Sequence, residues 1–352
     1  MPPLFVTIRI IKFLVVAGVL VLLVSTALIA DTHPTAMVTS ASPVQRGYKG
    51  TSAHGLSVAK FRYLKRTAGM TWFRDDALWS DVEPERGVFR WSRLDKLFRN
   101  ARAAKVNVLL IIDYSTSWSG TPPRSNADYA DFAGRVADRY HDFGGSLAFE
   151  FWNEPYMSWT WGGQRPDPVK YAGMVRAAAT AVRGRRYGIA LVANVDPRNY
   201  ADGSNYFDEF LEADPTIFRS LDAWSVHAYA ANCSPLADLD GTCTKLKRDW
   251  RFDRIARVQS IAKAHGASRP IWVTEFGWST CTDDPDECVT ERQQAAYTAL
   301  AIRRARNDWG VQRLFVHTGD RDGTGPDKES RYGMFRPDGT DKPIVAAIGR
   351  AS

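Results

Sequence analysis

Hydrophobic and polar positions alternate in regular blocks from residue 47 to the C-terminus. Short, mostly apolar runs are typical of strands buried on both faces. Eight such runs occur, at residues 47–52, 70–74, 107–112, 147–152, 188–193, 223–227, 270–275 and 312–317. Longer helix-like segments lie between and after them, and two of these segments place apolar residues at spacings of three and four. The predicted helices are residues 57–67, 91–104, 126–141, 168–183, 206–212, 253–265, 291–307 and 342–350.

This order of strands and helices predicts an α/β fold with a parallel sheet and crossover helices. Eight successive strand–helix units fit a (β/α)8 TIM barrel with enlarged loops. A doubly wound open sheet is the alternative, but no glycine-rich phosphate loop follows a predicted strand, so its nucleotide-binding version lacks a fingerprint. We therefore predict a single barrel domain over residues 47–352.

The first 46 residues follow a different pattern. Arg9 and Lys12 precede an uncharged apolar run from residue 13 to residue 30, and Asp31 ends this run. Such an arrangement is typical of an export signal, although the run is also long enough to remain as a membrane anchor. We predict residues 1–30 to be a signal peptide or N-terminal anchor and the Pro/Ser/Thr-rich residues 31–46 to be a linker. The protein is then secreted, or anchored to the outer face of the cytoplasmic membrane.

The composition is that of a soluble globular protein. A net charge of +7 raises the question of a nucleic-acid partner. The arginines are spread along the predicted helices rather than gathered in a block, which argues against such a partner. The 12 tryptophans and 13 tyrosines are a generous supply, many of them in predicted loops, which would suit stacking on sugar rings.

Four cysteines occur in two close pairs, Cys233 with Cys243 and Cys281 with Cys288. Four cysteines permit three connectivities, and the short spacings favour two local disulfides, 233–243 and 281–288. A metal site is the alternative, but the flanking residues lack the Cys-x-x-Cys or histidine spacing that zinc requires. We therefore expect two disulfides and no metal.

Polar and aromatic residues gather where the predicted strands end, which is the face where barrel enzymes carry their sites. They are Asp75, Asp113, Tyr114, Asn153, Glu154, Asn194, His227, Tyr229, Glu275 and His317. Glu154 and Glu275 each follow or close a core strand. Either glutamate alone is better explained as a helix cap or an ion-pair partner. Two together are what a retaining glycosidase needs, one protonated as general acid and the other ionised as nucleophile.

The chain from about residue 48 to residue 349 resembles clan A of the glycoside hydrolases. These retaining barrel enzymes carry the acid/base on strand four and the nucleophile on strand seven, where Glu154 and Glu275 stand here. Within the clan the chain is similar to family thirty-nine and its cellulase-like bacterial relatives. Three further segments carry the resemblance, residues 73–91 for strand two, 225–229 for strand six and 332–343 for the closing stretch.

The resemblance implies roles for the matching positions. Glu154 is expected to be the acid/base and Glu275 the nucleophile, kept ionised by Arg74 and the Tyr229 hydroxyl. Asn153 is expected to bind the sugar 2-hydroxyl, with a strand-end cap as the alternative. For Arg74 the alternative is a structural ion pair inside the barrel.

Other candidates have more than one interpretation. His227 binds a sugar hydroxyl, orients Glu154 or is a satisfied core histidine, and His54 at the mouth of strand one has the same alternatives. Four tryptophans are candidates for sugar stacking, Trp152, Trp159, Trp161 and Trp278. Of these, Trp152 is the one that a core position explains best.

One position departs from the clan pattern. Clan members commonly place a tryptophan at the end of strand eight, beneath the sugar, where His317 stands here. The resemblance therefore implies a more polar sugar floor than the family has.

We predict an exported retaining glycoside hydrolase that cleaves β-glycosidic bonds in a polysaccharide or oligosaccharide and uses no cofactor. Loop aromatics on several strands favour endo action. A transglycosylase would use the same residues. The rival from another class is a catalytically idle barrel that binds envelope polysaccharide, whose clearest sign would be loss of either glutamate, and both are present.

Overall fold

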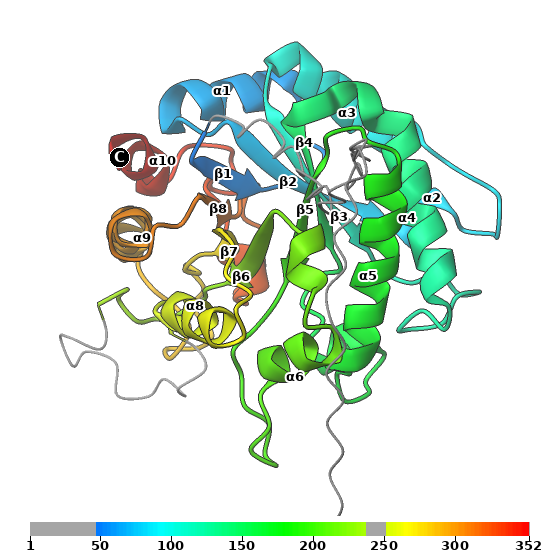
Figure 1. Cartoon of the computed structure of the whole chain (residues 1–352). Helices are drawn as coiled ribbons and strands as arrows, with labels where there is room; N and C mark the ends of the chain where they lie inside the picture. Colours follow the sequence, from blue (N-terminus) through cyan, green and yellow to red (C-terminus); the bar gives the residue numbers. More distant parts are fainter. Residues whose placement is uncertain (1–46, 237–250, 352) are drawn as a thin grey trace, which may run out of the picture. The chain divides into compact units, whose positions relative to one another are not determined.

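The structure is a computed structural model that describes residues 47–236 and 251–351. Eight parallel strands close into a barrel in sequence order, from β1 to β8 (Figure 1). The strands are β1 (Lys49–Ser52), β2 (Trp72–Leu78), β3 (Asn107–Asp113), β4 (Leu147–Phe151), β5 (Ala190–Asn194), β6 (Ala223–His227), β7 (Ile271–Phe276) and β8 (Arg313–His317). Because β1 pairs in parallel with β8, from Lys49 opposite Leu314 to Ser52 opposite His317, the open-sheet alternative is excluded.

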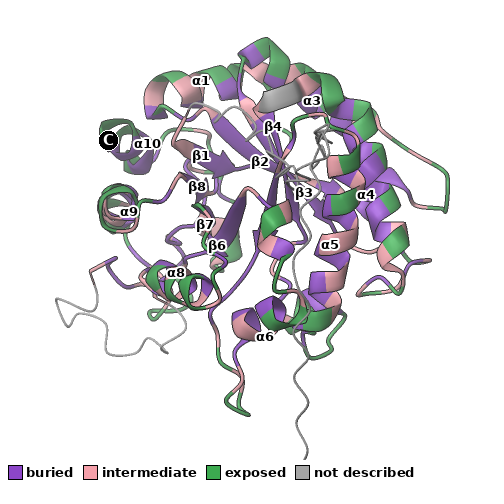
Figure 2. Cartoon of the chain, in the orientation of Figure 1, coloured by how far each residue is buried: buried purple, intermediate pink, exposed green. Residues whose placement is uncertain are grey.

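Helices follow the strands and surround the barrel. They are α1 (Val58–Ala68), α2 (Trp79–Val82), α3 (Ser92–Ala104), α4 (Asn126–Tyr140), α5 (Pro168–Gly184), α6 (Tyr206–Ala213), α8 (Arg254–Ala264), α9 (Glu291–Trp309) and α10 (Pro343–Arg350). Short 3-10 helices are η1 (His141–Ser146), η2 (Ser158–Trp161), η3 (Ile217–Ser220) and η4 (Glu329–Arg331). In Figure 2 the helices show a buried side and an exposed side, while the strands are almost wholly buried.

The predicted fold is confirmed, with small differences at the element ends. Each predicted strand and helix is present within a few residues of its expected position. The largest difference is β2, which continues to Leu78 rather than ending at Arg74. The helix ends have local causes. For example, α9 begins with a capping box between Thr290 and Gln293 and ends at Gly310, whose φ of 58° suits a residue without a side chain.

The barrel interior is built in layers, because alternate residues of each strand point inward. A lower apolar layer consists of Trp72, Leu109, Ala148, Val192, Ala223, Trp272 and Phe315. Gly50 completes it, because a side chain there would collide with the Phe315 ring at 2.6 Å. Two residues further along the same strands stand Ser52, Arg74, Ile111, Glu150, Asn194, Ser225, Thr274 and His317. All but one of these eight are polar, so the barrel changes from apolar to polar toward the carboxyl ends of its strands.

Membrane attachment and export were predicted from residues 1–46, which lie outside the described residues. Within residues 47–236 and 251–351, no helix is long and apolar enough to cross a bilayer.

Candidate active site

A cavity of about 520 Å³ opens at the carboxyl ends of the strands. This volume lies within the range of about 300–1,000 Å³ typical of small-molecule sites. Most of the predicted site residues line it, namely His54, Arg74, Asn153, Glu154, Trp159, Tyr229, Glu275 and His317. The structure therefore brings together side chains that are far apart in the sequence.

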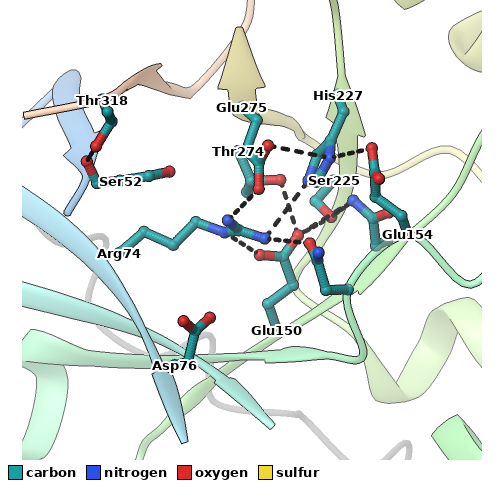
Figure 3. A network of polar contacts seen from close by, with 12 residues as sticks. Ser52, Arg74, Asp76, Glu150, Glu154, Ser225, His227, Thr274, Glu275 and Thr318 are labelled. Atoms are coloured by element: carbon teal, nitrogen blue, oxygen red, sulfur yellow. Dashed lines mark hydrogen bonds and ion pairs between the residues drawn. The ribbon is translucent and has the colours of Figure 1, made fainter. Parts of the chain in front are cut away.

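Glu154 and Glu275 face each other across one imidazole (Figure 3). The Nδ1 atom of His227 lies 2.9 Å from Oε1 of Glu154 and 3.6 Å from Oε2 of Glu275. These two oxygens are consequently no more than about 6.5 Å apart. The carboxyl groups of a retaining enzyme lie about 5–5.5 Å apart, and those of an inverting enzyme about 6.5–9.5 Å apart. The upper bound here therefore equals the lower limit of the inverting range. The Glu154 and Glu275 side chains are 18% and 12% exposed, so both reach the cavity while remaining largely shielded from water.

The backbone after β4 is what brings Glu154 to this position. Trp152 has a φ of 61° and Glu154 a φ of 45°, both in the left-handed region that non-glycine residues rarely occupy. Such conformations are found most often at functional sites, where surrounding packing holds them in place.

Arg74 joins several groups at the base of the cavity. Its side chain is 3% exposed. Its Nη1 donates to Oε1 of Glu275 at 2.5 Å, its Nη2 donates to Oδ1 of Asn153 at 2.9 Å, and its Nε donates to Oε2 of Glu150 at 2.6 Å. The expected ion pair with Glu275 is thus present, and it belongs to a larger buried network.

The electrostatics around Glu275 favour a carboxylate. Burial by itself would raise the pKa of Glu275, but the positive charges of His227 and Arg74 outweigh it and hold that pKa below its ordinary value. The Tyr229 hydroxyl adds a hydrogen bond of 2.6 Å to Oε2. Glu275 is therefore ionised at neutral pH, which is the state that a nucleophile requires.

His227 is a buried residue that contacts Glu154 rather than a residue that lines the cavity. Its side chain is 1% exposed. Burial opposes a charge on the imidazole, but Glu275 and Glu154 together raise its pKa above the ordinary value. Arg254 donates to the His227 carbonyl oxygen at 3.1 Å, which fixes the end of β6. Of the interpretations open from the sequence, this geometry matches the one in which His227 orients Glu154.

Two histidines stand on the side of the cavity formed by β1, β2 and β8. His54 is 63% exposed, and its ring nitrogens lie 3.1 Å from Asp76 and 3.2 Å from Asp320. Hydrogen bonds to Asp320 and then Asp76 raise the pKa of His54. His317 packs edge-on against the Tyr229 and Tyr332 rings, and its burial lowers its pKa. The floor at the end of β8 is accordingly a neutral imidazole among aromatic rings.

The tryptophans near the site divide into one exposed ring and three buried rings, a division that the sequence did not predict. Trp159 is 56% exposed and lines the cavity beside Tyr114, with ring centroids 6.3 Å apart. Trp161 and Trp278 are each 1% exposed and do not line it. Trp161 packs against Trp152, and Trp278 donates to the Cys233 carbonyl oxygen. The expectation that Trp161 and Trp278 stack on sugar is therefore wrong, because both rings are enclosed by protein. The core position of Trp152 is confirmed, at 0% exposure.

Several residues of the site were missed or misplaced. Asp76, rather than Asp75, lines the cavity, because alternation along β2 turns Arg74 and Asp76 to the same face. Asp75 instead accepts hydrogen bonds from the Gly55 amide and from Arg93. Glu150 lies fully buried under Arg74, and its signal was a single charge within an apolar strand. Loop residues Glu287, Lys328, Glu329 and Tyr332 also line the cavity. Tyr332 begins the closing stretch that carries the resemblance, while the other three had no sequence signal.

The cysteine prediction is confirmed for one pair. Cys281 and Cys288 form a disulfide with a Cα–Cα distance of 5.0 Å. The pairing of Cys233 with Cys243 stays a prediction, since Cys243 lies outside the described residues. In the described part of the chain, one group of three potential metal ligands comes together, Cys281, Asp283 and Cys288. Both sulfurs of that group are bonded to each other, so they are not thiolate ligands.

Comparison with known proteins agrees with this geometry. Residues 152–345 match the family model described as glycosyl hydrolase catalytic core. No curated protein matches the chain.

Solved structures share the fold at low sequence identity. A family 39 glycoside hydrolase from the gut symbiont Bacteroides cellulosilyticus WH2 aligns with a TM-score of 0.67 and 22% identity, over 86% of this chain and 63% of its own. A glucosidase from Croceicoccus marinus aligns with a TM-score of 0.63 and 18% identity, over 86% of this chain and 65% of its own. An endo-β-1,4-glucanase from Xanthomonas axonopodis pv. citri, carrying a triple mutation, aligns with a TM-score of 0.59 and 16% identity, over 87% of this chain and 99% of its own. The chain thus spans less than two thirds of the first two structures.

Proposed function

Because the chain belongs to the glycosyl hydrolase catalytic core family, we propose that it is a retaining glycoside hydrolase acting on β-glycosidic bonds. Glu275 is the nucleophile and Glu154 the acid/base. The observation that carries this proposal is the placement of both carboxyl groups around the His227 imidazole, with Arg74 and Tyr229 bonded only to Glu275 of the two. Two chemically similar groups are thereby given different environments, as acid and nucleophile require.

In the first step Oε of Glu275 attacks the anomeric carbon of the sugar. The glycosidic C–O bond breaks as the C–O bond to Glu275 forms, and Glu154 gives its proton to the departing oxygen. In the second step Glu154, now a carboxylate, takes a proton from water. The water oxygen attacks the anomeric carbon and releases Glu275, and the configuration is retained overall. A sugar hydroxyl in place of this water would give transglycosylation by the same residues.

Asn153 is held ready for the sugar 2-hydroxyl. Its Oδ1 accepts from Arg74 at 2.9 Å, and its Nδ2 donates to the Tyr114 hydroxyl at 2.8 Å. These bonds fix the plane of the amide and leave the second Nδ2 hydrogen for a substrate oxygen. A contact of this kind strengthens in the transition state.

The two sides of the cavity differ in chemistry. The loop that follows Glu154 contributes Met157 and the exposed Trp159, which suit stacking on the sugar that leaves. The opposite side presents His54, Asp76 and His317, a hydrogen-bonding surface for the sugar that is attacked. A stacking platform beyond the cleavage point favours a polysaccharide or oligosaccharide that is cut internally. The export signal expected in residues 1–30 supports action outside the cytoplasm.

The purified protein would be tested against a panel of cell-wall and plant polysaccharides and aryl glycosides, with NMR detection of the anomer released first. We expect retained configuration and a series of oligosaccharide products. An inverted first product contradicts the role of Glu275. Binding without turnover on every substrate would instead favour an idle polysaccharide-binding barrel.

A further inference from the structure

Glu150 is a buried charge that the proposed chemistry does not yet use. It stands in the middle of β4, is 0% exposed, and has apolar residues before and after it in the strand. A carboxylate is costly to bury unless its oxygens are hydrogen-bonded. Its partners therefore indicate what it does.

Four donors from four different strands surround this carboxylate (Figure 3). Oε2 accepts from Arg74 Nε on β2 at 2.6 Å. Oε1 accepts from Asn194 Nδ2 on β5 at 3.2 Å, from Ser225 Oγ on β6 at 2.5 Å and from Thr274 Oγ1 on β7 at 2.8 Å. Three bonds fix one oxygen, so the position of the other oxygen, which holds Arg74, is also fixed.

The orientation of Arg74 follows from this contact. A guanidinium group is planar, so a fixed Nε–H bond determines where both Nη atoms point. From this position Nη1 reaches Glu275 and Nη2 reaches Asn153. These are the proposed nucleophile and the proposed ligand of the 2-hydroxyl.

We propose that Glu150 is a positioning residue that holds Arg74 against Glu275 and so sets the rate of nucleophilic attack. This inference rests on the proposed function, because it assigns Glu150 a role in the same reaction. Glu150 does not line the cavity and acts only through Arg74.

Glutamine has the shape of glutamate but lacks its charge. If its oxygen faces Ser225, Thr274 and Asn194, its amide N–H points at the Arg74 Nε–H, and two donors oppose each other. If its oxygen faces Arg74, the three groups that donate to Glu150 Oε1 must turn to accept from its amide, and Arg74 Nε keeps only a neutral acceptor. Glu150→Gln therefore loosens the hold on Arg74 with almost no change in volume.

The matched control is Asp322→Asn. Asp322 is likewise a buried carboxylate paired with a cation, with Oδ2 2.6 Å from Nζ of Lys342 and side chains 2% and 1% exposed. It lies outside the cavity lining. Both variants therefore neutralise a buried ion pair, but only one of these pairs includes Arg74.

The experiment measures how fast Glu275 becomes covalently labelled. The probe is a 2,4-dinitrophenyl 2-deoxy-2-fluoro-glycoside of a sugar that the wild type accepts. Glu275 displaces dinitrophenolate, which leaves with the bonding electrons and needs no proton, so the rate is independent of Glu154. We expect Glu150→Gln to lower the maximal labelling rate about 10²-fold, with little change in the probe concentration that gives half this rate. Asp322→Asn should label at the wild-type rate per folded molecule.

Each outcome decides a separate question. If wild type is labelled at Glu275 and Glu150→Gln labels equally fast, the positioning role is wrong while the proposed function stands. If Asp322→Asn slows labelling as much as Glu150→Gln does, the slowing reflects lost stability rather than the position of Arg74, and the inference is overturned. If Glu150→Gln does not fold, Ser225→Ala serves instead, because it removes one bond to Glu150 and keeps its charge. A smaller decrease in labelling rate supports the role, and the wild-type rate contradicts it. If no glycoside in the panel reacts with the wild type, the proposed function fails first.

Discussion

The hydrogen bond from Tyr229 to Glu275 permits a quantitative prediction, because one oxygen atom can be removed without disturbing the ring. The Tyr229 hydroxyl lies 2.6 Å from Oε2 of Glu275. Burial and the charge of Glu275 raise the pKa of Tyr229 well above its ordinary value, so the hydroxyl remains a donor throughout the working pH range. Tyr229→Phe therefore removes one donor to Glu275, the proposed nucleophile, and leaves the ion pair with Arg74 in place.

The size of the effect follows from the kind of bond. A hydrogen bond to a charged group contributes about 1.5–3 kcal/mol, and one pKa unit corresponds to about 1.4 kcal/mol. Because the bond stabilises only the ionised form, its loss raises the pKa of Glu275 by about one to two units. Glu275 is then protonated at a higher pH, so if it is the nucleophile, activity on the acidic side declines earlier.

The measurement is the pH dependence of kcat/KM with a dinitrophenyl glycoside, whose departure needs no proton from an acid. The acidic limb of this profile reports the ionisation of Glu275 in the free enzyme. We expect the limb to lie below the ordinary glutamate range in the wild type and to move up by about one to two pH units in Tyr229→Phe. The control is Tyr140→Phe, which removes a 2.9 Å bond from a tyrosine to Asp95 between α3 and α4. An acidic limb that stays in place, or moves down, while activity falls would refute the electrostatic role of Tyr229.

Three further predictions test other parts of the site. Glu154→Gln should slow cleavage of natural substrates by about 10²–10⁴-fold yet keep a rapid first burst of dinitrophenolate in stopped-flow measurements, and equal losses for good and poor leaving groups would contradict its role as acid/base. Trp159→Ala should raise KM for a polysaccharide by about 2- to 10-fold and leave KM for a glycosyl fluoride, whose leaving group has no ring to stack on the indole, unchanged, and parallel changes in both would exclude a stacking platform. Asp113 is fully buried, neither of its oxygens has a hydrogen-bond partner within residues 47–236 and 251–351, and burial, followed by the charge of Asp76, raises its pKa. A group whose pKa is raised by folding contributes stability that is present below its pKa in the unfolded chain and is lost as the pH rises through its pKa in the folded protein. Asparagine does not ionise, so Asp113→Asn should be more stable than wild type by about 1–3 kcal/mol at pH 8. The difference should vanish below about pH 4. A difference in unfolding free energy that is independent of pH would contradict this account.

The sequence predicts the barrel and its two glutamates for the same physical reason. In a parallel barrel the carboxyl ends of all strands meet at one face, so a residue at the end of a buried run is placed in space without further information. Glu154 and Glu275 lie 121 positions apart in the sequence, yet both contact His227. The residues beside them, Arg74 and Tyr229, follow from the family resemblance, and their bonds to Glu275 agree with it.

The misplaced residues depend on information that apolar runs do not contain. Asp76 and Asp75 differ only in the face of β2 that they occupy, and the prediction ended β2 at Arg74, before either residue. Trp159 and Trp161 lie two residues apart in η2, a short helix whose orientation is set by packing against Trp152. Loop aromatics therefore cannot be sorted into exposed and buried from composition.

The segment after β4 shows how one local feature serves both the core and the site. Strict alternation from Ala148 and Glu150 would point residue 152 into the barrel. The left-handed backbone at Trp152 instead directs its indole outward, against Tyr129 of α4 and Trp161, where it is fully buried. Left-handed backbone costs about 1–3 kcal/mol at a non-glycine residue. Burying about 150–250 Å² of an aromatic side chain contributes about 4–6 kcal/mol at ~25 cal/mol per Å², so the indole more than offsets the strain. A glycine at 152 would relieve the backbone and lose that anchor. The strained segment is held by core packing, and the turn that buries Trp152 is also the turn that brings Asn153 to Arg74 and Glu154 to His227.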